Sequence, residues 1–134
     1  MSELSIRVEP IPGFSALLMT WKQHPNPRDV SRVFAEMNVH LSAATKPLDV
    51  IVDLTENSKI PLQSTILEVL RGPARHPMMG VWIVAAPNSM ARIIGNVLLS
   101  LTRRENIVWH ATLEAAYADL YQMQPQEPSP SPMT

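Results

Sequence analysis

The segment Leu48–Leu54 reads LDVIVDL, and it decides the fold class of this 134-residue chain. It is short, and Val50, Ile51 and Val52 at its middle are all β-branched. β-Branched side chains favour extended backbone, and a strand with a continuous apolar run is typical of a parallel sheet that is covered on both faces. The segment therefore predicts a central strand of an α/β domain.

A helix is expected just before this strand, from Asn26-Pro27 to about Ala44. Asparagine is a good helix cap, and proline is tolerated at the first helical position. Apolar residues at helical spacing predict one buried stripe, which consists of Val30, Val33, Phe34, Met37 and Leu41. A strand paired in parallel with the central one would need such a crossover helix.

The alternation of helices and strands continues after the central strand. We expect a helix at about Pro61–Arg71, a buried strand at Val81–Ala86, a helix with an apolar stripe from Met90 to Leu101, a strand at Asn106–Trp109 and a last helix capped by Thr112. Gly72-Pro73 stops the first of these helices. Met78-Met79 either fill the core or lie exposed in a loop after Pro77.

The amino-terminal region predicts an antiparallel pair of strands at one sheet edge. Leu4, Ile6 and Val8 alternate with polar residues, which is the period of a strand with one solvent-facing side. A turn over Pro10–Gly13 leads to a second strand at Phe14–Trp21. The predicted fold is therefore α/β, with about five strands and about four helices in the order ββαβαβαβα, in a mixed, mainly parallel sheet.

Composition restricts the classes of function. Eleven basic and twelve acidic residues give a net charge of −1, so we expect no nucleic-acid partner. The absence of cysteine excludes a disulfide scaffold, and the start MSELSIRVEP has no cationic, apolar secretory pattern. No apolar run approaches the roughly 18 residues that a membrane span needs. We therefore expect a cytoplasmic protein without a membrane span.

The chain is expected to divide into a domain at residues 1–122 and a disordered proline-rich tail at residues 123–134. From Gln124 onward the sequence reads QPQEPSPSPMT. Prolines among polar residues cannot build a core and favour extended backbone. A second interpretation is that the tail is a ligand for a proline-recognising domain.

The order of elements, the strand end VIVDLT at residues 50–55 and the helix start TLEAA at residues 112–116 resemble the STAS domain. This is the fold of bacterial anti-sigma-factor antagonists, and the chain is similar to its divergent SpoIIAA-like members over roughly residues 3–122. The resemblance implies a STAS-like sheet and a regulatory, non-enzymatic role. The final helix at Thr112 corresponds to the last helix of that family.

The chain departs from this family at the phosphorylated helix start. In STAS antagonists an Asp-Ser-Ser-Gly motif follows the strand, and a kinase modifies its serine. The motif aspartate falls here on Pro61 and the phosphorylated serine on Leu62, while Ser64 and Thr65 come two to three residues later. The resemblance therefore implies an interaction module that has lost the usual phosphoserine switch, although a helix start suits a phosphate well.

Two candidate surfaces follow from these patterns. Ligands of parallel sheets bind beyond the carboxyl ends of the strands, which predicts a partner surface of Asp53, Thr55, Asn57, Ser58, Pro61, Leu62, Ser64 and Thr65. The simpler interpretation is that Asp53 and Thr55 satisfy loop amides. A possible anion patch consists of Arg71, Arg75 and His76, for which a solvated helix end is the simpler interpretation.

No catalytic, cofactor-binding or metal-ligating set is predicted. The four histidines form no HxxxH pair, and none has a carboxylate at ligand spacing. The GxSxG, GxGxxG and P-loop patterns are absent. An enzyme could still use Asp53 with a histidine that folding brings near it.

Two functions therefore stand as expectations. The first is a non-enzymatic STAS-like regulatory or protein-interaction module that binds a protein partner or a second copy of itself, as a homodimer. The alternative is a carrier or sensor of a small apolar or lipid-like ligand, because the methionines and the few charges would suit an internal pocket. The carrier predicts a cavity between the sheet and the second and third helices.

Overall fold

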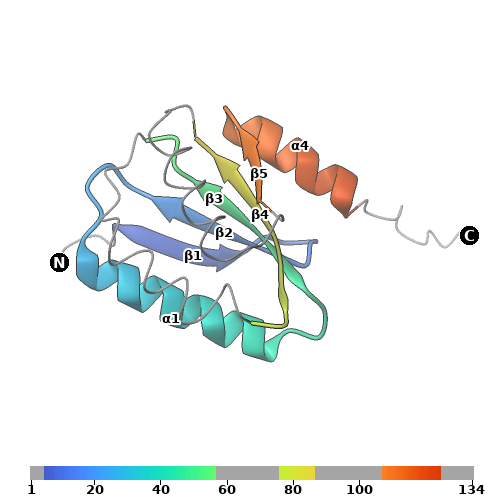
Figure 1. The fold of residues 1–134 in the computed structure, drawn as a ribbon, viewed down its shortest axis with the longest axis horizontal. Helices are drawn as coiled ribbons and strands as arrows, with labels where there is room; N and C mark the ends of the chain where they lie inside the picture. The colour runs from blue at the N-terminus through green and yellow to red at the C-terminus, as the bar shows by residue number, and fades with distance from the viewer. Residues whose placement is uncertain (1–4, 57–75, 87–106, 125–134) are drawn as a thin grey trace, which may run out of the picture.

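The computed structural model describes residues 5–56, 76–86 and 107–124, and the five strands in these ranges form one sheet (Figure 1). The strands are β1 (Ile6–Pro10), β2 (Ala16–Trp21), β3 (Leu48–Asp53), β4 (Met79–Ala85) and β5 (Ile107–His110). They lie in the order β1-β2-β3-β4-β5. β1 is antiparallel to β2, and the other neighbours are parallel. This confirms the predicted mixed, mainly parallel five-stranded sheet.

Two helices within the described residues cover opposite faces of the sheet. They are α1 (Pro27–Ala43) and α4 (Leu113–Met123). Side chains alternate along a strand, so Val50 and Val52 pack with α1 while Ile51 packs with α4. Both faces of β3 are buried, as its unbroken apolar run predicts. The predicted helices at 61–71 and 90–101 lie outside the described residues.

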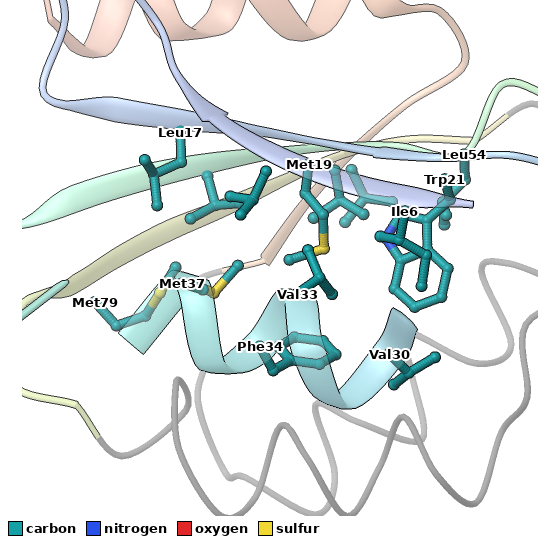
Figure 2. Close-up of a cluster of buried hydrophobic side chains, with 14 of the residues drawn as sticks. Ile6, Leu17, Met19, Trp21, Val30, Val33, Phe34, Met37, Leu54 and Met79 are labelled. Carbon is teal, nitrogen blue, oxygen red and sulfur yellow. The ribbon is translucent and has the colours of Figure 1, made fainter. Parts of the chain in front are cut away.

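The core on the α1 face is built by the predicted stripe of that helix. Val33 and Met37 point from α1 toward Met19 on β2 (Figure 2), and all three side chains are buried. Trp21 and Phe34 pack with their ring centroids 6.5 Å apart. Because this face combines five residues of α1 with side chains from four strands, it fixes the position of α1 against the sheet.

Local hydrogen bonds set both ends of α1. The Asn26 side chain accepts a hydrogen bond from the Arg28 amide at 2.9 Å, and Pro27 stands in the first turn. At the other end the Ala44 amide donates to Leu41 at 3.2 Å. The predicted start and end of this helix are therefore confirmed.

The outer edge of β1 is protected against pairing with another chain. The Ile6 carbonyl accepts a hydrogen bond from Arg32 Nη2 of α1 at 2.6 Å. Pro10, at the end of the strand, has no amide hydrogen to offer. Cationic side chains and prolines are common protections of sheet edges. We therefore expect partners to bind elsewhere than along this edge.

Several boundaries differ from the predicted ones, among them the start of β2 at Ala16 instead of Phe14 and the end of β5 at His110 instead of Trp109. Three further differences have a structural reason. β1 continues through Pro10, where a turn was expected. The proline fits because the neighbouring Ile11 donates inward to Ala16, so that the nitrogen of Pro10 faces away from β2. β4 begins at Met79, two residues before the predicted Val81, and the Met79 side chain is buried, which confirms the core-filling interpretation for this residue.

The third difference lies at the end of α4, which continues to Met123, past the expected boundary at residue 122. Gln124 caps it and is held by its side chain. Its Nε2 donates to the Ser15 carbonyl at 2.9 Å and to Asp49 Oδ2 at 2.8 Å, and its Oε1 accepts from the Ser15 amide at 2.8 Å. The folded part of the chain therefore includes Gln124.

Candidate functional site

The carboxyl end of β3 is an exposed turn that Asp53 organises. Asp53 Oδ1 accepts hydrogen bonds from the Thr55 amide at 3.0 Å and from Thr55 Oγ1 at 2.6 Å. The Leu54 amide donates to the Ala85 carbonyl at 2.9 Å, and the Leu54 side chain is buried. The Asp53 carboxylate therefore shapes the turn, and Thr55 and Glu56 are left exposed beyond it.

Asp53 therefore satisfies a loop amide, as in the simpler interpretation, while the Thr55 hydroxyl donates to Asp53 and not to the backbone. The exposed part of the turn is still available for recognition, because Leu54 anchors it in the core while Thr55 faces solvent. The other residues of the predicted partner surface lie outside the described residues. They are Asn57, Ser58, Pro61, Leu62, Ser64 and Thr65.

A histidine–carboxylate pair lies at the same end of the parallel strands as Asp53. His110 ends β5 and is in register with Ala85, which is in register with Asp53. The His110 Nε2 lies 2.8 Å from Asp119 Oδ2 of α4, and both side chains are mostly buried. Sequence reasoning missed this pair because nine residues and a change from strand to helix separate its members.

The structure does not bring His110 and Asp119 together with Asp53, the carboxylate that was considered as a partner for a histidine. Asp53 is two strands away in the register, and its Oδ1 is engaged by Thr55. No hydroxyl group among the described residues is hydrogen-bonded to His110. The pair joins the end of β5 to α4.

A second histidine, His76, lies near a serine of α1. Its Nδ1 accepts a hydrogen bond from the Met78 amide at 3.1 Å, and its Nε2 lies 3.3 Å from Ser42 Oγ. An imidazole nitrogen that accepts a hydrogen bond carries no proton, so the neutral ring carries its proton on Nε2. This nitrogen can donate to Ser42 but cannot take its proton. The pair therefore lacks the tautomer that a serine nucleophile requires.

His76 is also the one residue of the predicted anion patch that the structure describes. Arg71 and Arg75 lie outside the described residues. Its Nδ1 is occupied by the Met78 amide, so Nε2 is the ring nitrogen that faces Ser42.

Tyr117 of α4 lies between the sheet and solvent near two carboxylates. Partial burial raises the pKa of its hydroxyl, and the negative charges of Asp53 and Glu9 raise it further. All three causes disfavour the phenolate. The Tyr117 hydroxyl therefore remains a hydrogen-bond donor on the α4 face of the sheet.

A hollow of about 440 Å³ lies beside the carboxyl-terminal half of α1. Its described lining consists of Asn38, Val39, Ser42 and Ala43. The Val39 side chain is 69% exposed, and the Oδ1 of Asn38 is buried with no hydrogen-bond partner. The described residues contain no group of three or more side chains that could hold a metal ion.

The chain matches no protein-family model, no curated protein and no solved structure in the three comparisons with known proteins. No helix among the described residues is long and apolar enough to cross a membrane. The fold and the chemistry of the site are therefore the observations that bear on function.

Proposed function

We propose that this chain is a non-enzymatic regulatory or protein-interaction module with a STAS-like sheet. Its partner surface is the exposed turn at Asp53–Glu56, together with the chain that follows it. The observation that supports this most is the Asp53–Thr55 turn itself. It is a preformed, exposed loop at the carboxyl end of a central parallel strand, where such sheets bind their ligands.

The rigidity of this turn favours recognition. Leu54 is buried below it, and two hydrogen bonds to one carboxylate oxygen hold Thr55 above it. A preformed loop loses little conformational entropy when a partner binds. The partner surface then continues into the predicted helix start at Pro61, Leu62, Ser64 and Thr65. In this proposal the surface acts without a phosphoserine, because Leu62 stands at the position of the modified residue.

The chemistry of the two histidines supports a non-enzymatic role. His110 lies against Asp119, and both ring nitrogens of His76 contact groups of the fold, the Met78 amide and Ser42 Oγ. Both histidines are thus used to join elements of the fold. A binding role needs neither residue to change its protonation state during a reaction.

The test is quantitative capture of partners from cells that express the tagged chain. Thr55→Arg adds bulk and charge on the proposed surface, and Leu62→Asp does so at the predicted helix start. Val39→Arg is the matched control, because Val39 is an exposed apolar residue on the other helix, α1. We expect one stoichiometric partner, lost with Thr55→Arg and Leu62→Asp and retained with Val39→Arg. Equal recovery with all three variants would contradict the proposed surface.

A second proposal is a carrier or sensor of a small apolar ligand. A solvent-open hollow beside α1 supports it, because the exposed side chain of Val39 and that of Ala43 line it. The cavity expected between the sheet and the second and third helices lies outside the described residues. Trp82 and Trp109 are also only partly buried against the α1-face core. The test is native mass spectrometry of freshly purified chain, which should show a bound small molecule whose fraction falls in Val39→Arg. If every preparation shows only the mass of the chain without a ligand, the carrier proposal is contradicted.

A further inference from the structure

A ledge of apolar side chains lies on the α4 face of the sheet beside α4. It consists of Phe14, Leu18, Tyr117 and Tyr121, which we call the aromatic ledge. The rings of Phe14 and Tyr121 meet edge to face with their centroids 5.0 Å apart. Tyr121 is 55% exposed, and the other three are partly buried against the α4-face core.

The ledge is left open by the way α4 packs. α4 makes its main contacts with β3, β4 and β5, and on β2 it leaves Leu18 partly exposed while Ala16 is buried in the α4-face core. Leu18 and Thr20 of β2 are only partly buried, and Arg7 and Glu9 of β1 are exposed. The result is a band of aromatic and aliphatic surface, with α4 on one side and charged residues on the other.

The described part of the chain ends at Gln124, beside Phe14 of the ledge. Gln124 makes its three hydrogen bonds to Ser15 and Asp49, and Ser15 directly follows Phe14 of the ledge. The ten residues after Gln124 read PQEPSPSPMT and include four prolines. Extended polyproline backbone rises about 3.1 Å per residue. This reach exceeds the four-residue step from Phe14, just before β2, to Leu18 in β2, which is about 13 Å at roughly 3.3 Å per residue.

We propose that the aromatic ledge is the docking site of the chain's own proline-rich segment, residues 125–132, in polyproline II conformation. Aromatic-lined grooves bind such segments because prolines pack on the rings and the backbone carbonyls, which make no internal hydrogen bonds, accept from ring hydroxyls. Ordering this segment on the ledge costs little conformational entropy, because the backbone of each proline is already restricted in solution.

The polar residues of the ledge fit this occupant. The Tyr117 hydroxyl stays protonated, since burial and the charges of Asp53 and Glu9 raise its pKa, so it can donate to a carbonyl of the segment. Arg7 offers the opposite charge to Glu127, the one acidic residue after Gln124. Gln124 holds the start of the segment in place, which makes docking within one chain a local event with a high effective concentration.

The experiment uses the full chain, which contains no cysteine. Ser131→Cys therefore gives a single site for a nitroxide label. The label reduces the intensity of nearby amide resonances, and this loss is measured on ¹⁵N-labelled protein. We expect the Leu18 and Tyr121 amides to lose several-fold more intensity than that of Val39, on the opposite face. Equal losses at Leu18 and Val39, or no loss at either, would overturn the proposal.

Two further arms test the chemistry and the occupant. Tyr121→Ala and the triple change Pro128→Ala, Pro130→Ala, Pro132→Ala should each return Leu18 to full intensity, while Val39→Ala should leave the effect unchanged. An unchanged effect in the triple variant contradicts docking through the prolines. Mixing nitroxide-labelled ¹⁴N chain with unlabelled ¹⁵N chain should produce no loss. A loss in the mixture means that a second copy supplies the segment, which contradicts docking within one chain.

Discussion

Asp49 holds together three segments that are distant in the sequence. Its Oδ1 accepts from the Val81 amide at 2.8 Å, its Oδ2 accepts from Gln124 at 2.8 Å, and its own amide donates to the Ser15 carbonyl at 3.0 Å. A Cβ on Gly80 would lie 2.3 Å from Asp49 Oδ1. The glycine therefore makes room for the carboxylate, where the β3–β4 register is irregular.

Gln124→Ala tests this clamp. The change removes three hydrogen bonds in a partly buried place, and we expect the free energy of unfolding to fall by about 1–3 kcal/mol. Urea denaturation measures it. Gln122→Ala is the matched control, because Gln122 is exposed on α4, and it should be near neutral. Equal stability of the two variants would show that Gln124 does not hold α4 to the sheet.

Asp29 predicts a pH dependence of stability. The Ser5 hydroxyl and then the Ser5 amide donate to its carboxylate, and the charge of Arg32 adds to this, so the pKa lies below its ordinary 3.8. Between the folded pKa and 3.8 the unfolded chain binds more protons, so stability rises with pH there. The contribution is complete above the unfolded value and is lost as the pH falls through the folded one.

Ser5→Ala should therefore lower stability most at neutral pH. The difference from the unsubstituted chain should shrink as the pH falls below 3.8, without vanishing, because Ser5 Oγ also accepts from the Asn26 amide. Urea titrations from pH 7 to pH 2.5 measure this, with the exposed Ser31→Ala as control. A difference that grows in acid would contradict the assigned role of Asp29.

At the scale of elements, both described helices could be predicted, α1 with both of its ends and α4 with its start. Their caps are local, since each cap side chain contacts an amide two or three residues along: Asn26 to Arg28, and Thr112 to Ala115. The predicted boundaries of the strands are less exact, because the pairing partner decides where a strand begins. Met79 joins β4 through its register with Leu48, which no local pattern around Pro77–Gly80 reports.

Thr112→Ala tests the cap of α4. Its Oγ1 accepts from the Ala115 amide at 3.1 Å, and loss of such a cap costs about 1 kcal/mol. Thr112→Ser keeps the hydroxyl and should retain most of the stability in thermal or urea unfolding. If the alanine and serine variants unfold alike, the cap contributes nothing.

At the scale of the whole molecule, long-range contacts were beyond sequence reasoning. Gln124 lies 109 residues from Ser15 in the sequence, and His110 reaches Asp119 across the start of a helix. The sheet itself could be predicted because strand–helix–strand units require parallel neighbours. In the candidate partner surface, the end of the predicted strand was enough to place the exposed turn at Asp53–Thr55. Its internal hydrogen bonds follow from the aspartate that stands two residues before the threonine.

The overall arrangement also restricts where a partner can bind. Arg32 and Pro10 protect the β1 edge, and α4 covers β3, β4 and β5 on one face. The exposed turn after β3 lies at the end of these strands, where none of these elements protects it. The turn is therefore the surface that these elements leave open to a partner.

The most direct test of that role is hydrogen exchange, measured by mass spectrometry on the chain alone and in complex with the partner recovered by capture. The proposal predicts slower exchange of the amides at Asp53–Glu56 in the complex, with the amides at Val39–Ala43 of α1 unchanged. Protection confined to α1, or no change at the turn in a complex that is fully formed, would contradict the account.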